Sequence, residues 1–265
     1  MEFSRRSTFD FRSPGSRARS ERLILAILVA LTLAAWIATV VQSGSGGMGM
    51  GLTMGLTGPL FLAIWSTMMA AMMFPSSAPM ILAFACACRD RRGRHDAFVP
   101  TLAFAGAYLL VWVGAGGVAF LLAQWLQNLG MQSMWLMHNA ARFAGLVFVA
   151  AGVYQLSPPK RMCLAKCRSP QDFVFTSWRD GYLGAVQMGL RHGQLCLGCC
   201  WLLFAILFPL GVMSVPAMAV LALLIFAEKI LPAGIAISRG VGAALTLYGI
   251  LVLALPQALP LAGRM

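Results

Sequence analysis

One segment of the chain places a histidine and three cysteines on a single side of a helix. They are His192, Cys196, Cys199 and Cys200, and the residues between them are mostly apolar. At about 100° per residue these side chains fall at roughly 0°, 40°, 340° and 80° around the helix axis, so they share one face. Thiolate and imidazole together suit Cu(I) or Zn(II) as ligands. The alternative is that the cysteines pack in a core as small hydrophobic residues.

A second pair of cysteines lies in a basic segment bounded by prolines, residues 157–170. Cys163 and Cys167 are four residues apart, which is about one helical turn. Two thiolates from this segment and two or three from residues 192–200 would complete a three- or four-coordinate metal site. The alternative is an ordinary basic loop that carries two exposed cysteines.

Four methionines form a third group of soft ligands within an apolar stretch. They are Met68, Met69, Met72 and Met73. They make two pairs spaced four residues apart, just before Pro75 and Pro79, where we expect the helix to bend and backbone carbonyls to be freed. A thioether binds Cu(I) far better than it binds hard cations, so this group could form a resting place for a transported ion. Packing alone is the alternative, because methionine commonly fills membrane cores.

The composition sets the class of protein that positions these side chains. Hydrophobic residues make up 60% of the chain and charged residues only 11%, against roughly 25% charged in a soluble domain. We therefore expect an all-α, polytopic transmembrane helical bundle in a lipid bilayer. Six or seven apolar stretches approach the ~20 residues that a membrane span needs. Their approximate bounds are 23–41, 59–85, 98–123, 137–156, 193–212, 216–230 and 241–255.

The net charge of +12 is distributed as in a membrane protein rather than a nucleic-acid-binding one. Lysines and arginines concentrate before the first stretch and in the second and fourth linkers, whereas the first and third linkers, 42–58 and 124–136, carry no charge. This asymmetry predicts a cytoplasmic N-terminus by the positive-inside rule. We expect a polar, basic, poorly ordered tail at 1–22, a transmembrane domain at 23–265 and no nucleic-acid partner.

This topology places all seven cysteines in the cytoplasmic half of the protein, where thiols stay reduced. Several methionines lie in the outward segments, among them Met48, Met50 and Met54 in a glycine-rich loop. Thioethers remain ligands in an oxidising compartment, whereas thiolates bind more tightly where they are kept reduced. Methionine outside and cysteine inside therefore favours Cu(I) over Zn(II) as the bound ion.

Glu228 and Lys229 are adjacent charges near the end of an apolar stretch, directly before Leu231 and Pro232. Charged residues within membrane segments usually mark function. Near a helix end, however, a lysine can reach the interface and anchor the helix there. The sequence supports both interpretations, and we carry both residues forward as candidate functional positions.

Four segments together resemble a bacterial family described as predicted metal-binding integral membrane proteins, a domain of unknown function. The matching segments cover 65–75, 154–170, 189–213 and 228–232, within a region of about 59–235. The resemblance implies a multi-pass helical protein of the bacterial inner membrane with a metal site, and it supplies no reaction or substrate. Its recurring positions carry over to Met72, Met73, Cys163, Cys167, His192, Cys196, Cys199, Cys200 and Glu228.

The residues and the resemblance together predict a non-enzymatic protein that binds a soft transition metal for handling or transport. Cu(I) is favoured over Zn(II), and a copper chaperone or cuproprotein is the candidate partner. A membrane thiol oxidoreductase that uses Cys196 and Cys199 is the first alternative, but no outer cysteine pair is present to exchange electrons with it. A scaffold or assembly subunit with merely packed cysteines is the second alternative.

Overall fold

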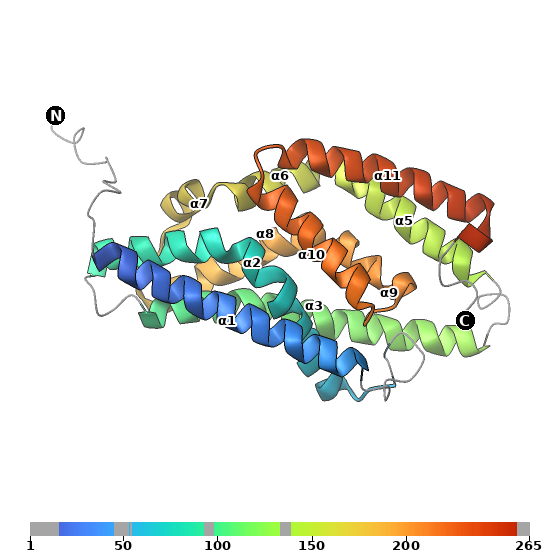
Figure 1. Ribbon diagram of the computed structural model, residues 1–265, viewed down its shortest axis with the longest axis horizontal. Coiled ribbons are helices and arrows are strands. Elements are labelled where there is room, and N and C mark those ends of the chain that lie inside the picture. The colour runs from blue at the N-terminus through green and yellow to red at the C-terminus, as the bar shows by residue number, and fades with distance from the viewer. Residues whose placement is uncertain (1–15, 45–52, 54, 93–97, 133–138, 259–265) are drawn as a thin grey trace.

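The computed structural model describes residues 16–44, 53, 55–92, 98–132 and 139–258, and this part of the chain is an all-α bundle (Figure 1). The predicted fold class is therefore confirmed. The helices are α1 (Ser16–Gly44), α2 (Gly58–Arg92), α3 (Phe98–Gln132), α5 (Ala140–Leu156), α6 (Pro158–Arg168), α7 (Pro170–Ser177), α8 (Gly181–Ala205), α9 (Leu207–Leu210), α10 (Val215–Ile230) and α11 (Gly234–Ala254), followed by the 3₁₀ turn η1 (Pro256–Ala258).

Most described residues of each predicted apolar stretch lie in helices, and the stretch at 193–212 is interrupted at Ile206 and ends in non-helical residues at Gly211 and Val212. Five helical segments are long and apolar enough to cross a membrane, and a sixth forms if α5 and α6, bent by 62° at Ser157, count as one broken span. The stretch at 216–230 forms α10, whose 16 residues are fewer than the ~20 of a simple span. Helix α1 begins at Ser16, inside the segment expected to be a tail, whereas the methionines at 48, 50 and 54 lie outside the described residues.

Helix α2 is the central element of the bundle. In the most apolar 18-residue segment of α2, 67% of the residues are buried. The corresponding fraction is 17% in α1 and 22% in both α3 and α11. Helices α1, α3, α7 and α10 all pack against α2. The outer helices instead expose large apolar side chains such as Val118 and Leu247. Surfaces this apolar are typical of helices that contact lipid.

Glycines allow α5 and α11 to pack at very short range along their length. A Cβ atom added at Gly152 would lie 2.5 Å from the backbone nitrogen of Thr246 and 2.7 Å from the carbonyl oxygen of Gly242. A Cβ atom at Gly249 would lie 2.6 Å from the backbone nitrogen of Val149. Small residues at such contacts let two backbones approach closely, which is the main source of helix association in membranes. This pairing holds α5, and α6 after it, in place.

Helix α2 remains helical through Pro75 and Pro79 and changes direction near its middle (Figure 1). A proline removes a backbone donor, so the expected consequence is a bend with carbonyl oxygens left for other donors. The hydroxyl of Ser76 donates to the carbonyl oxygen of Met73 at 3.1 Å, and that of Ser77 donates to Phe74 at 3.2 Å. These hydroxyls stabilise the bent region beside the methionines.

The basic segments of the chain meet at one end of the bundle, here called the basic end. Arg89, near the end of α2, forms an ion pair of 3.3 Å with Glu21, near the start of α1. A groove of about 520 Å³ lies at this end and is lined by α1, α2 and the junction of α6 and α7. The sequence placed these segments on one side of a membrane, and in the fold they are neighbours.

Candidate metal centre

The histidine and three cysteines of α8 all face the interior of the bundle. The exposed fractions are 2% for His192, 0% for Cys196, 1% for Cys199 and 2% for Cys200. A spacing of i, i+4, i+7 and i+8 puts side chains on one side of a helix, and here that side is covered by α3 and α6. The shared face expected from the sequence is therefore the buried face of α8.

Cys196 lies at the centre of contacts from three other helices. Its thiol is hydrogen-bonded to the hydroxyl of Tyr108 in α3 at 3.2 Å, and it lies 4.0 Å from the thioether sulfur of Met73 in α2. From α10, the ammonium of Lys229 donates to the same sulfur at 3.0 Å. One thiol thus meets a hydroxyl, a thioether and a cation in a space closed to solvent.

Helix α6 brings a fourth thiol to this place. Its buried residues are Lys160, Leu164 and Cys167, a stripe at i, i+4 and i+7 that faces the bundle. The thiol of Cys167 lies close enough to that of Cys199 for the two to influence each other electrostatically. The segment predicted as a basic linker is thus a helix, and it places a cysteine against those of α8. We call Cys167, Cys196, Cys199 and Cys200 the thiol cluster.

Cys163 lies at the margin of this cluster and is half-buried. It packs against α8 at Gly198, where an added Cβ atom would lie 3.1 Å from the Cys163 sulfur. The hydroxyl of Tyr154 donates to the carbonyl oxygen of the same glycine. The two cysteines of α6 therefore both contact α8, with Cys167 enclosed and Cys163 partly accessible.

His192 is enclosed by aromatic rings rather than by polar groups. Its ring lies 5.2 Å from that of Tyr108 and 6.0 Å from that of Phe104, both stacked, and 5.6 Å from the edge-on ring of Phe173. Both ring nitrogens are buried, and neither has a hydrogen-bond partner among the residues that the structure describes. Buried polar atoms are normally satisfied, so an unpartnered imidazole one turn from Cys196 is a group available to a ligand.

All four methionines of the α2 group are buried in the same core, with exposed fractions of 1% or less. Met73 is the member that reaches Cys196. Met69 precedes Met73 by one helical turn, and Met68 and Met72 make the parallel pair. The group therefore extends from the thiol cluster along α2, away from the basic end.

Glu228 and Lys229 point to two different polar groups. The carboxylate of Glu228 accepts hydrogen bonds from the ammonium of Lys160 and from the amide of Gln155, both at 2.7 Å. Lys229 turns to Cys196 and to the hydroxyl of Ser76, 3.2 Å away. Because Glu228 and Lys229 are 1% and 7% exposed, interfacial anchoring does not describe them.

The thiols are close neighbours, but they do not converge as ligands. The thiol of Cys199 donates to the carbonyl oxygen of Cys196 at 3.0 Å, and that of Cys200 donates to the same oxygen at 2.8 Å. Among the described residues, no three His, Cys, Asp or Glu side chains are arranged to hold an ion as they stand. Rotation of these two side chains away from their own helix would be needed to aim both sulfurs at one ion.

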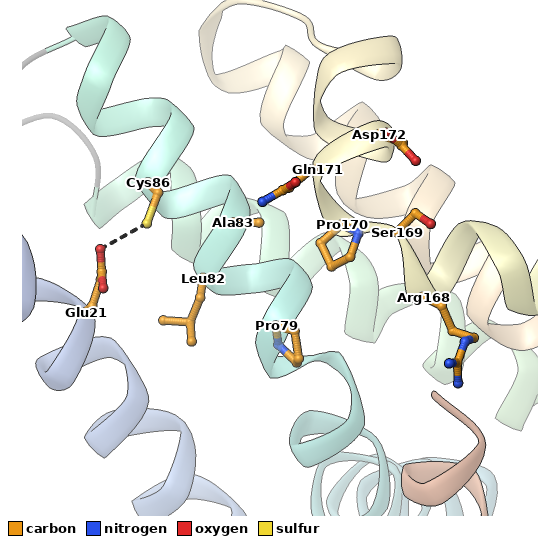
Figure 2. Close-up of a pocket in the computed structure, with 10 residues that line it drawn as sticks. All are labelled: Glu21, Pro79, Leu82, Ala83, Cys86, Arg168, Ser169, Pro170, Gln171 and Asp172. Atoms are coloured by element: carbon orange, nitrogen blue, oxygen red, sulfur yellow. Dashed lines mark hydrogen bonds between the residues drawn. The ribbon is translucent and has the colours of Figure 1, made fainter. Parts of the chain in front are cut away.

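The groove at the basic end is lined by residues of α1, of α2 and of the junction of α6 and α7 (Figure 2). Arg168 and Pro79 line it, the first adjacent in sequence to Cys167 and the second one turn after the bend of α2. Cys86 also lines the groove, and its thiol donates to the carboxylate of Glu21 at 3.3 Å. Cys88, two residues further along α2, is buried.

Sequence reasoning did not single out several polar residues that shape this centre. Tyr108 and Ser76 looked like ordinary members of apolar helices. Gln155 and Lys160 lay within the family-like segment 154–170 but were given no role of their own. Lys160 carried a usable signal, since it begins the i, i+4, i+7 stripe that ends at Cys167. For Tyr108 and Ser76 the local sequence gives no sign, because their partners come from other helices.

These features define a helical bundle of membrane-spanning dimensions with a buried group of thiols, a thioether and an imidazole. A family model described as a copper chaperone, PpoB2, matches residues 62–252 of the 265-residue chain. The chain therefore belongs to this copper chaperone family, which is consistent with the metal-related family that the sequence resembles and fits a role without catalysis. Among curated proteins and among solved structures, no match to the chain was found.

Proposed function

We propose that this protein is a multi-pass protein of the bacterial inner membrane that binds Cu(I) at the thiol cluster and passes it to a partner cuproprotein. The observation that carries the proposal is the meeting of Cys167 from α6 with Cys199 from α8, next to Cys196 and its Met73 neighbour. Soft donors from three separate helices thus lie together in a place closed to solvent. The family's description as a copper chaperone supports copper as the cargo.

The donor types favour Cu(I) over Zn(II). Zinc is held by cysteine, histidine and carboxylate ligands, whereas a thioether is a ligand for a softer ion. Met73 lies against Cys196, and the nearest carboxylate in the polar network, that of Glu228, is already bound to Lys160. In our proposal Cys167, Cys196, Cys199 and Cys200 supply the thiolates, with His192, Cys163 and Met73 as further donors.

The basic end faces the cytoplasm in this proposal. The arginines and lysines near Glu21, Arg89 and Arg168 favour that side by the positive-inside rule. The thiol cluster then lies in the inner half of the membrane. In this proposal reduced carriers approach at the groove of Figure 2, which Arg168, the residue after Cys167, helps to line. Cys86, on the wall of that groove, would be the first thiol to receive the ion.

Met68, Met69, Met72 and Met73 lead from the thiol cluster toward the opposite end of α2. We propose that they accept Cu(I) in turn on its way to a partner, because ion exchange between soft donors needs no change of oxidation state. In this proposal the thiolates supply the tight binding, and the weaker thioether donors supply release.

The test is copper binding by the purified protein in lipid nanodiscs, measured by competition with a colorimetric Cu(I) chelator under reducing conditions. The wild type is expected to bind Cu(I) stoichiometrically. A variant with Cys163, Cys167, Cys196, Cys199 and Cys200 all replaced by serine is expected to lose this binding.

The matched control replaces Cys86 and Cys88, which lie on α2 outside the cluster, with serine. This control should bind the same number of copper ions as the wild type. Only its rate of copper loading should fall, because Cys86 is absent. The proposal would be overturned if the wild type removed no Cu(I) from the chelator. It would also be overturned if the two variants lost Cu(I) binding to the same extent.

A further inference from the structure

Lys229 is a buried cation directed into the thiol cluster. Lys229 is 7% exposed, and its ammonium lies 3.0 Å from the sulfur of Cys196 and 3.2 Å from the hydroxyl oxygen of Ser76. An ammonium is expensive to bury unless an anion or several hydrogen bonds compensate for lost water. The sulfur groups of the cluster are the anions that this cation can meet.

The neighbouring carboxylate does not neutralise Lys229. Glu228 immediately precedes Lys229 in α10, but its two carboxylate oxygens accept hydrogen bonds from Lys160 and Gln155. In the described residues the ion pairs with carboxylates involve Lys160 and Arg89, and neither includes Lys229. Among the described residues, the hydrogen bonds of the Lys229 ammonium therefore go to the sulfur of Cys196 and to the hydroxyl of Ser76.

We propose that Lys229 is the residue that makes the site select a monovalent over a divalent ion. This inference rests on the proposed function, since it concerns which ion the thiol cluster holds. Whichever of the thiols are deprotonated, Zn(II) brings one more positive charge than Cu(I) to a position beside the ammonium of Lys229. That extra charge lies in an apolar interior, where repulsion between cations is weakly screened.

The physical basis is the distance between the ammonium and the ion. An ion bound to the Cys196 sulfur would lie about 2.3 Å from that atom. Lys229 contacts the same atom, so ion and ammonium would be only a few ångströms apart. With the same ligands, a divalent ion is repelled by Lys229 about twice as strongly as a monovalent one, because Coulomb energy is proportional to charge.

The experiment compares the dissociation constants of Cu(I) and of Zn(II) for the wild type and for Lys229→Leu, in nanodiscs and by chelator competition. Leucine removes the charge and, unlike methionine, brings no thioether donor for Cu(I) beside Cys196. The ratio of the two constants is expected to shift toward Zn(II) by roughly tenfold or more. An unchanged ratio, or a shift toward Cu(I), would overturn the inference.

The matched control is the double variant Lys160→Met with Glu228→Gln, which removes a buried lysine and its carboxylate together. It leaves the charge at Cys196 unchanged, so both metals should be affected equally and the ratio should stay at the wild-type value. Should Lys229→Leu fail to fold, Lys229→Gln removes the same charge while retaining a donor for Ser76, and the same shift in ratio is expected.

The two proposals fail in different ways. Wild-type protein that binds no Cu(I) contradicts the proposed function. Wild-type protein that binds Cu(I), together with a Lys229→Leu variant whose ratio is unchanged, contradicts only the role of Lys229.

Discussion

The ammonium of Lys160 lies 2.7 Å from the carboxylate of Glu228, and the two side chains are 0% and 2% exposed. This ion pair joins α6 to α10 inside the bundle. Removing one partner of a buried pair leaves an uncompensated charge, which costs about 3–5 kcal/mol. We therefore expect Lys160→Met to lower the free energy of unfolding by about 3 kcal/mol or more, as measured by denaturant unfolding of the purified protein in mixed micelles.

The control for this prediction adds Glu228→Gln to the same chain. The double variant should recover most of the lost stability, because neither residue at positions 160 and 228 is then charged. The amide oxygen of the new glutamine can still accept a hydrogen bond from Gln155. If the single and double variants are equally unstable, the ion pair is not the source of the effect.

His192→Phe is expected to change stability and metal affinity in opposite directions. Phenylalanine fits a place lined by Phe104, Tyr108 and Phe173, and it removes two buried nitrogens without partners. An unsatisfied buried polar group costs about 1–3 kcal/mol, so the unfolding free energy should stay the same or rise. Affinity for Cu(I) should fall by roughly tenfold if the imidazole is a ligand. A parallel loss of both quantities would point to a packing role instead.

Met73→Leu should weaken copper binding while leaving the fold intact. Leucine replaces methionine in cores at a cost below about 1.5 kcal/mol, but it has no sulfur to offer beside Cys196. We expect roughly tenfold weaker Cu(I) binding and slower release to an added chelator. Met80→Leu, at a buried position on the other side of the α2 bend, is the matched control and should behave as the wild type. Identical effects of the two substitutions would rule out a specific role for Met73.

The contact of α5 with α11 predicts opposite effects of two glycine substitutions. Gly152→Ala would place a Cβ atom 2.5 Å from the backbone of Thr246, so the helices must separate, at a cost of about 1–3 kcal/mol. At Gly240, also in α11, an added Cβ atom would meet nothing within 4 Å. Gly240→Ala should therefore stabilise the helix by about 0.5–1 kcal/mol. The unfolding free energies of both variants in micelles check this prediction.

The sequence predicted the helices and the buried face of α8 because both depend on local pattern. Hydropathy over about 20 residues identifies a membrane helix without reference to its neighbours. The angular positions of His192, Cys196, Cys199 and Cys200 follow from helix geometry alone. The prolines at 158 and 170 marked breaks in the chain, but the segment between them was predicted as a basic linker rather than as the short helix α6.

The partners of these side chains could not be predicted in the same way. Whether Cys167 meets Cys199 depends on the bend between α5 and α6, which tertiary packing sets. The sequence left Lys229 equally open to anchoring and to function, since a lysine near a helix end can turn to either side. Its direction toward Cys196 follows from the packing of α10 against α2 and α8. Whether these cysteines act as ligands is tested by copper binding to the purified cysteine variants.

The opposite directions of Glu228 and Lys229 have a mechanical consequence for α10. One residue is bonded to α5 and α6, and the next is bonded to α2 and α8. Any turn of α10 about its own axis would pull both side chains from their partners at once. These two adjacent residues thus fix the rotation of α10 about its axis. Movement of α5 and α6, or of α2 and α8, is transmitted through α10 to the other pair of helices.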